Sequence, residues 1–187
     1  MSRVRNVVAA LVATALVAAA FAQPVQDTPP KEPPAKPTHP ALENLKSLAG
    51  EWFQADDPSR DTGERKDTQP ACIYKVVSAG SAVQETLFPG TPHEMVTMYH
   101  LDGDNLVLTH YCALANQPRM KAEKSDDPSK LIFKFAGGTN VDPAKDQHMH
   151  DLTITFLDAD HFRAEWVLHD GGKQKDVKTF QFYRKRK

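Results

Sequence analysis

Beyond Gly50, apolar and polar positions alternate in short runs that are separated by turn-forming residues. Strict alternation is typical of strands with one buried face, because successive side chains point to opposite sides of a sheet. The runs recur at intervals of roughly 8–12 residues without helical patterns between them, as in successive antiparallel hairpins. This pattern predicts ten strands, near residues 51–56, 71–78, 81–88, 94–101, 105–112, 118–124, 130–136, 149–157, 161–168 and 174–184.

Several of these strands carry a file of large apolar side chains on one face. The files are Leu131, Phe133 and Phe135; Leu152, Ile154 and Phe156; Phe162, Ala164, Trp166 and Leu168; and Phe180 and Phe182. Closing the sheet into a barrel buries these files and leaves no unpaired edge. We therefore expect an all-β fold, a barrel of about ten antiparallel strands in up-and-down order, with a two-sheet sandwich as the alternative.

One short helix is expected before the first strand. Leu42, Leu45 and Leu48 recur every three residues, Pro40 suits the start of a helix, and Gly50 suits its end. The spacing predicts a helix of about two turns immediately before the barrel.

Two motifs at the ends of the predicted barrel resemble those of a known superfamily. Leu48-Ala49-Gly50-Glu51-Trp52 is similar to the Gly-x-Trp start of the calycins, the lipocalin and fatty-acid-binding-protein superfamily. Phe180-Gln181-Phe182-Tyr183-Arg184 resembles the calycin final strand. The chain looks most like the bacterial exported lipocalin-like proteins, and nitrobindin is a more distant likeness. The resemblance implies a calycin-like β-barrel in which Arg184 packs on Trp52 through a cation–π contact, with at most a cavity for a small ligand and no particular reaction.

Residues 1–22 have the organisation of a secretory signal peptide. Arg3 and Arg5 precede an apolar run from Val7 to Phe21, and Ala20-Phe21-Ala22 is a small-x-small cleavage site. The run of about 15 residues is shorter than the roughly 20 residues that span a bilayer as a helix. We therefore expect cleavage rather than an uncleaved anchor, no integral membrane segment in the mature chain, and an exported protein that is periplasmic or secreted.

The next segment, residues 23–40, contains seven prolines among 18 residues. Proline lacks the backbone donor and has a fixed φ, so this segment is predicted to be an extended, disordered linker. A proline-rich ligand for a binding module is the alternative. Residues 41–187 then make up the calycin-like barrel domain.

Composition narrows the classes of partner. The chain has 23 Lys and Arg against 24 Asp and Glu, a formal net charge of -1. Binding to nucleic acid would require a basic excess, so we expect no nucleic-acid partner. Two cysteines are too few for a domain held together by disulfides. The sequence has no nucleophile elbow, phosphate-binding loop, Rossmann glycine pattern or His-Glu-x-x-His motif.

The segment from Met95 to Met120 is unusually rich in side chains that form hydrogen bonds. A four-residue hairpin loop at 102–105 would place Thr97 opposite His110, although alternation alone does not say which face is interior. Apolar pockets with a few polar groups are typical of small-ligand sites, so we expect a small hydrophobic or amphipathic ligand, with Arg119 meeting any anionic group. The candidate ligand-binding residues are Met98, His100, His110, Tyr111, Asn116, Gln117, Arg119 and Trp166.

Histidines near the end of the chain suggest an alternative function. His148 and His150 are two residues apart, so on one strand both imidazoles could bind the same metal ion, and His161 and His169 lie on the next predicted strand. The likeness to nitrobindin also allows haem as cofactor, with His148 or His150 as the axial ligand. A Cys-x-x-Cys-His motif for covalent haem attachment is absent from the sequence.

A second alternative is an enzyme that acts on a small molecule within the barrel. His110 with Glu85 or Glu165 could serve an isomerase or hydrolase, but no catalytic residue is assigned. Cys72 and Cys112 lie on different predicted strands and could form a disulfide in an oxidising compartment or remain two thiols.

Overall fold

The computed structural model describes residues 39–54 and 69–184. The predicted signal peptide, residues 23–38 of the predicted linker and the end of the first predicted strand lie outside the described residues. Within them, the expected helix and all ten expected strands are present.

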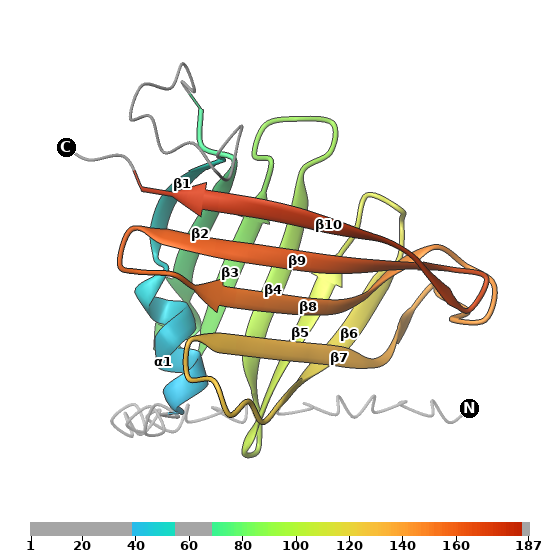
Figure 1. The fold of residues 1–187 in the computed structure, drawn as a ribbon, viewed down its shortest axis with the longest axis horizontal. Coiled ribbons are helices and arrows are strands. Elements are labelled where there is room, and N and C mark those ends of the chain that lie inside the picture. The colour runs from blue at the N-terminus through green and yellow to red at the C-terminus, as the bar shows by residue number, and fades with distance from the viewer. Residues whose placement is uncertain (1–38, 55–68, 185–187) are drawn as a thin grey trace, which may run out of the picture. The chain divides into compact units, whose positions relative to one another are not determined.

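Ten antiparallel strands form one closed barrel in up-and-down order, and the last strand returns to pair with the first (Figure 1). The predicted fold class is confirmed, and the sandwich alternative is wrong because the sheet is continuous around the barrel. The elements are α1 (Pro40–Ser47), β1 (Gly50–Gln54), β2 (Cys72–Val77), a 3₁₀ turn (Ser78–Gly80), β3 (Ala82–Leu87), β4 (Met95–Asp102), β5 (Asn105–Tyr111), β6 (Gln117–Glu123), β7 (Lys130–Thr139), β8 (His148–Phe156), β9 (His161–Asp170) and β10 (Lys173–Tyr183).

The up-and-down order gives the barrel two different ends. The helix end carries α1, the start of β1 and the hairpins β2–β3, β4–β5, β6–β7 and β8–β9. The loop end carries the connections β3–β4, β5–β6, β7–β8 and β9–β10. Leu42 and Leu45 of α1, and Leu48 immediately after it, are buried and belong to the same core cluster as the strand side chains, so the helix covers its end of the barrel with apolar surface.

Aromatic side chains fill the interior beneath the helix. The ring of Phe162 contacts the Trp52 indole edge-on at 4.7 Å between centroids and stacks on Phe182 at 4.8 Å. These three side chains are at most 1 % exposed. Burying each of them contributes about 2–3 kcal/mol to folding, so this cluster fixes β1, β9 and β10 against one another.

The expected contact between the first and last strands is confirmed. The Arg184 guanidinium lies 4.1 Å from the centroid of the Trp52 ring. It also donates hydrogen bonds to the carbonyl oxygens of Ser47, at 2.7 Å, and Ala49, at 3.0 Å. The Trp52 indole nitrogen donates to the Leu48 carbonyl at 2.7 Å. One cationic side chain therefore ties the end of α1 to both strands that close the barrel.

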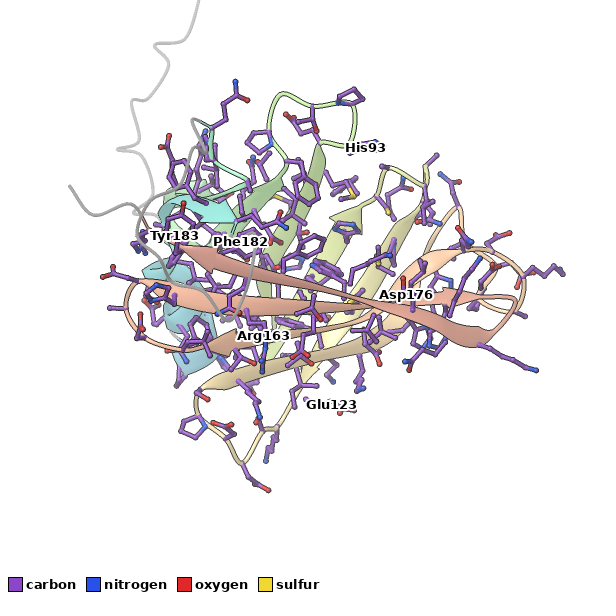
Figure 2. The ribbon with its side chains drawn as sticks, turned by 45° about the horizontal axis from the view of Figure 1, so that its top comes forward. His93, Glu123, Arg163, Asp176, Phe182 and Tyr183 are labelled. Atoms are coloured by element: carbon purple, nitrogen blue, oxygen red, sulfur yellow. The ribbon has the colours of Figure 1, made fainter. Side chains whose placement is uncertain are left out.

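Apart from Glu85, the Asp, Glu, Lys and Arg side chains of the described strands are not buried. Glu123 of β6 and Asp176 of β10 are exposed, and His93 marks the β3–β4 connection at the loop end (Figure 2). Arg163 of β9 forms an ion pair with Glu165 on the same strand, at 3.4 Å. The outer wall is therefore polar, while the unusual chemistry lies inside.

Candidate functional site

A row of three buried polar residues crosses the interior of β3, β4 and β5. Glu85 pairs with Thr97, and Thr97 pairs with His110, at directly opposed positions of neighbouring strands. Each is 1 % exposed. The predicted register of the β4–β5 hairpin is confirmed, and the face that carries Thr97 and His110 is the interior face. Strand pairing therefore assembles a polar site within an otherwise apolar core.

The Glu85 carboxyl accepts hydrogen bonds from groups on β2 and β4. The Tyr74 hydroxyl donates to Oε1 at 2.8 Å, and the Tyr99 hydroxyl donates to Oε2 at 2.7 Å. The Cys72 thiol lies 3.7 Å from Oε1. Burial raises the pKa of Glu85 above its usual 4.5, and the hydrogen bonds from Tyr99, Tyr74, Thr97 and Cys72 partly offset that increase. Such donors are what allows a carboxyl group to occupy an apolar interior.

Thr97 connects this carboxyl to His110. The Thr97 hydroxyl oxygen lies 2.9 Å from His110 Nδ1, and its hydrogen bond to Glu85 stabilises the carboxylate. Because the hydroxyl donates its only proton to Glu85, it accepts from His110 Nδ1–H. Burial lowers the pKa of His110 from 6.5 to about 4, so the imidazole is neutral at neutral pH. In this tautomer Nε2 carries a lone pair and accepts hydrogen bonds.

The Trp166 indole packs beside the His110 imidazole. The two rings are 4.5 Å apart between centroids. His110 Nε2 and Trp166 Nε1 are both buried, and neither has a hydrogen-bond partner among the described residues. Two neighbouring rings of the interior thus carry one acceptor, from β5, and one donor, from β9, that have no partner among the described residues.

Asn116 adds a third such atom at the loop end. Its Nδ2 donates to the Gln147 carbonyl at 2.7 Å, which fixes the β5–β6 connection against the β7–β8 connection. Its Oδ1 is buried without a partner in the part of the chain that is described. The loop end therefore combines a rigid rim with an available acceptor.

Other candidate ligand residues lie on the outer side of the same strands. Tyr111 is 50 % exposed, and His100 and Arg119 are exposed. With Gln117 they line a half-open groove of about 860 Å3 along β4, β5 and β6. Arg119 reaches the Thr139 hydroxyl at 3.4 Å. The structure thus brings the candidate residues together as two separate sets, one on each face of the wall.

The remaining candidates divide between the same two faces. Met98 pairs with Thr109, away from the buried file, and is half-buried on the outer side. Trp166, His110 and Asn116 form the inner set.

Glu165, which the sequence offered as a catalytic partner of His110, faces outward beside Arg163. Glu85 and His110, by contrast, both contact Thr97. Sequence reasoning missed Thr97 as this bridge, although the hairpin register placed it opposite His110.

Both cysteines are free thiols in this structure. Burial raises the pKa of Cys72 well above 9.0, and burial also raises the pKa of Cys112. Both side chains are therefore protonated at neutral pH, and the Cys72 thiol acts as a weak donor to Glu85. A thiol of this kind is a poor nucleophile.

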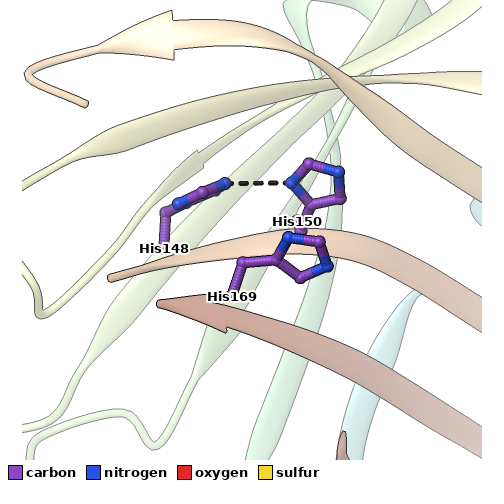
Figure 3. Close-up of side chains that lie close together, drawn as sticks. All are labelled: His148, His150 and His169. Carbon is purple, nitrogen blue, oxygen red and sulfur yellow. Dashed lines mark hydrogen bonds between the residues drawn. The ribbon is translucent and has the colours of Figure 1, made fainter. Parts of the chain in front are cut away.

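The histidines late in the chain separate into two groups. His148 and His150 of β8 lie close to His169 of β9 at the loop end (Figure 3). His161 lies at the start of β9, where its Nδ1 is 2.9 Å from the Asp158 carboxylate. The candidate metal-binding pair of His148 and His150 is therefore part of a cluster of three histidines, the third of which is His169.

Comparison with protein-family models and with curated proteins finds no match to this chain. Among the described residues, no helix is long and apolar enough to cross a membrane.

Proposed function

We propose that this protein is an exported, calycin-like barrel that binds a small, uncharged amphipathic molecule at the loop end of its interior. The observation that supports this most strongly is that two buried polar atoms on neighbouring rings, His110 Nε2 and Trp166 Nε1, have no hydrogen-bond partner among the described residues. A buried polar atom without a partner costs about 1–3 kcal/mol, and native proteins leave few of them. A ligand that bonds to both atoms would recover that free energy.

The chemistry of the pair limits the ligand. A hydroxyl group can donate to His110 Nε2 and accept from Trp166 Nε1–H at the same time. Asn116 Oδ1 offers a second acceptor nearer the rim. None of the buried side chains among the described residues is Lys or Arg, so an anionic head group would find no countercharge there. The proposed ligand is therefore an alcohol or a similar neutral polar group attached to an apolar body.

The calycin assignment is part of the same proposal. It is supported by the Gly50-Glu51-Trp52 start, the Arg184 contact with Trp52 and the ten-stranded closed barrel. The proposed export to the periplasm or the medium is supported by the organisation of residues 1–22 and the proline-rich segment after them. An exported ligand-binding barrel of this kind would act as a carrier or sensor, with no catalysis assigned.

The test measures binding of the neutral fluorescent probe N-phenyl-1-naphthylamine to the full mature chain, and its displacement by a medium-chain alcohol. Trp166→Phe keeps an aromatic ring and removes the N–H donor. Because one hydrogen bond contributes about 1 kcal/mol, we expect the displacing alcohol to bind about 5–10-fold more weakly. Arg119→Gln, in the outer groove, is the matched control and should change nothing.

Two results would contradict the proposal. If Arg119→Gln weakens binding of the alcohol and Trp166→Phe leaves it unchanged, the ligand binds in the outer groove instead. The second result is that the folded wild-type chain fails to bind the probe and shows no bound mass in native mass spectrometry of protein purified from its own cells. These two observations together would contradict ligand binding itself.

A further inference from the structure

We propose that His148, His150 and His169 form a binding site for a divalent transition-metal ion such as Zn2+ or Cu2+. This site does not depend on the proposed small-molecule ligand. It uses different residues, and it stands or falls on separate measurements.

A β-bulge brings the three rings together. His148 of β8 pairs directly with His169 of β9, and Met149 pairs with Leu168. The pairing then resumes at Asp151 with Val167, so His150 is the extra residue of a bulge. Bulges redirect side chains and are common next to functional sites. Here the bulge leaves one nitrogen from each of the three histidines within 4.8 Å of the others.

Hydrogen bonding fixes the tautomer of the most buried ligand. His148 is completely buried, and its Nδ1 lies 2.9 Å from the Asp146 carbonyl oxygen. A carbonyl only accepts, so Nδ1 carries the proton and Nε2 of the neutral ring carries a lone pair. That lone pair points into the cluster, 2.9 Å from His150 Nδ1 (Figure 3). Donation from the far ring nitrogen to a backbone carbonyl is the usual support of a metal-binding histidine.

Packing holds two of the rings in place. Phe135 lies 4.9 Å from the His148 ring and 4.7 Å from the His150 ring, nearly parallel to the latter. The nearby Asp151 carboxylate is engaged by Lys134 Nζ at 2.8 Å and by the Phe135 amide at 3.3 Å. The donors that face one another are therefore three imidazoles. Imidazole is a preferred ligand for zinc, copper and nickel, and not for magnesium or calcium.

The third ring must move to complete the site. His169 stacks on His150 with 3.7 Å between centroids and 2° between planes. One metal ion cannot lie in both of two parallel ring planes, and a tetrahedral site with bonds of about 2.0–2.1 Å needs nitrogens about 3.3 Å apart. The His169 ring forms no hydrogen bond with any described residue and no ring contact with Phe135, so it is the ring that rotates. Three protein ligands then leave a further coordination position open.

The test uses the full mature chain without a polyhistidine tag. Zn2+ and Cu2+ are each titrated against a chromophoric chelator of micromolar affinity, and the metal bound per chain is counted by elemental analysis. We expect one equivalent in the wild type. His150→Gln and His169→Gln should each lower affinity at least 10-fold, whereas His161→Gln, on the same strand as His169 but at its other end, should not.

Electron paramagnetic resonance of the Cu2+ form gives a second readout. The spectrum should show coupling to three nitrogens in the wild type and to two in His169→Gln. Saturating Zn2+ should raise the unfolding temperature of the wild type and of His161→Gln, but not of His169→Gln. Circular dichroism and urea unfolding check that each variant is folded.

The proposal is overturned if the wild type loses all metal to the chelator. It is equally overturned if His161→Gln weakens binding as much as His169→Gln does, or if the bound Cu2+ keeps the same nitrogen coupling in His169→Gln. In each case the three rings would be a structural cluster held by stacking and hydrogen bonds.

Discussion

Acidification should destabilise the barrel through the buried imidazole of His110. Its pKa in the folded protein is about 4, below the ordinary value of 6.5, because burial disfavours the charged ring. Between these two values the unfolded chain binds more protons than the folded chain, so stability falls as pH falls. Each tenfold difference in proton affinity is worth about 1.4 kcal/mol, which gives about 3 kcal/mol for the complete titration and about 2 kcal/mol between pH 7 and pH 5.

The perturbation that isolates this effect is His110→Gln. The glutamine amide can still donate to Thr97, so the hydrogen bond toward Glu85 is kept, but the side chain no longer titrates. Glu85 acts with the opposite sign, since its raised pKa means that its contribution to stability is lost as pH rises above 4.5. Because Glu85 is present in both proteins, its contribution cancels in the difference between them.

The assay is urea unfolding of the wild type and His110→Gln at several pH values between 7 and 4.5. We expect the wild type to lose about 2 kcal/mol relative to the variant between pH 7 and pH 5. A difference between the two proteins that stays constant over this range would refute the reasoning, because it would mean that His110 protonates as easily in the folded chain as in the unfolded one. Direct titration of the His110 ring by NMR would then give a pKa near 6.5.

Three further predictions concern stability, each measured by urea unfolding at neutral pH. Glu85→Gln places an amide donor against tyrosine hydroxyls that need an acceptor, and we expect a loss of about 1–3 kcal/mol; an unchanged midpoint would show that those hydroxyls have other acceptors. Arg184→Met removes the cation on Trp52 and three bonds to backbone carbonyls, for about 1–3 kcal/mol, and a neutral result would mean that the barrel closes without this contact. Phe133→Ala should cost about 3–5 kcal/mol, whereas Val177→Ala on the outer wall should stay within about 0.5 kcal/mol; equal losses would contradict the assignment of inner and outer faces.

Alternation and turn residues were sufficient to predict the barrel and one of its registers. The β4–β5 hairpin could be aligned because the turn at 102–105 fixes which residues oppose one another, and this places Thr97 opposite His110. The contact between Trp52 and Arg184 could be predicted from the resemblance of the two terminal motifs. Both predictions depend on features that lie close together in the sequence or at its recognisable ends.

The composition of the sites could not be predicted in the same way. His169 joins His148 only because a bulge shifts the pairing of β8 and β9 by one residue, and alternation carries no signal for such an insertion. Arg119 and Tyr111 were grouped with His110, yet which face of a strand points inward depends on the closure of the whole sheet. The meeting of His110 with Trp166 has the same origin, since the two residues belong to distant strands.

The most direct test of the central claim follows the two tryptophan indole N–H signals by NMR during titration with a medium-chain alcohol. Trp52 serves as an internal control, because its indole nitrogen already donates to the Leu48 carbonyl beneath α1. We expect the Trp166 signal to shift in a saturable manner while the Trp52 signal stays in place. A ligand that binds without moving the Trp166 signal, or that moves both signals equally, would contradict an interior site at the loop end.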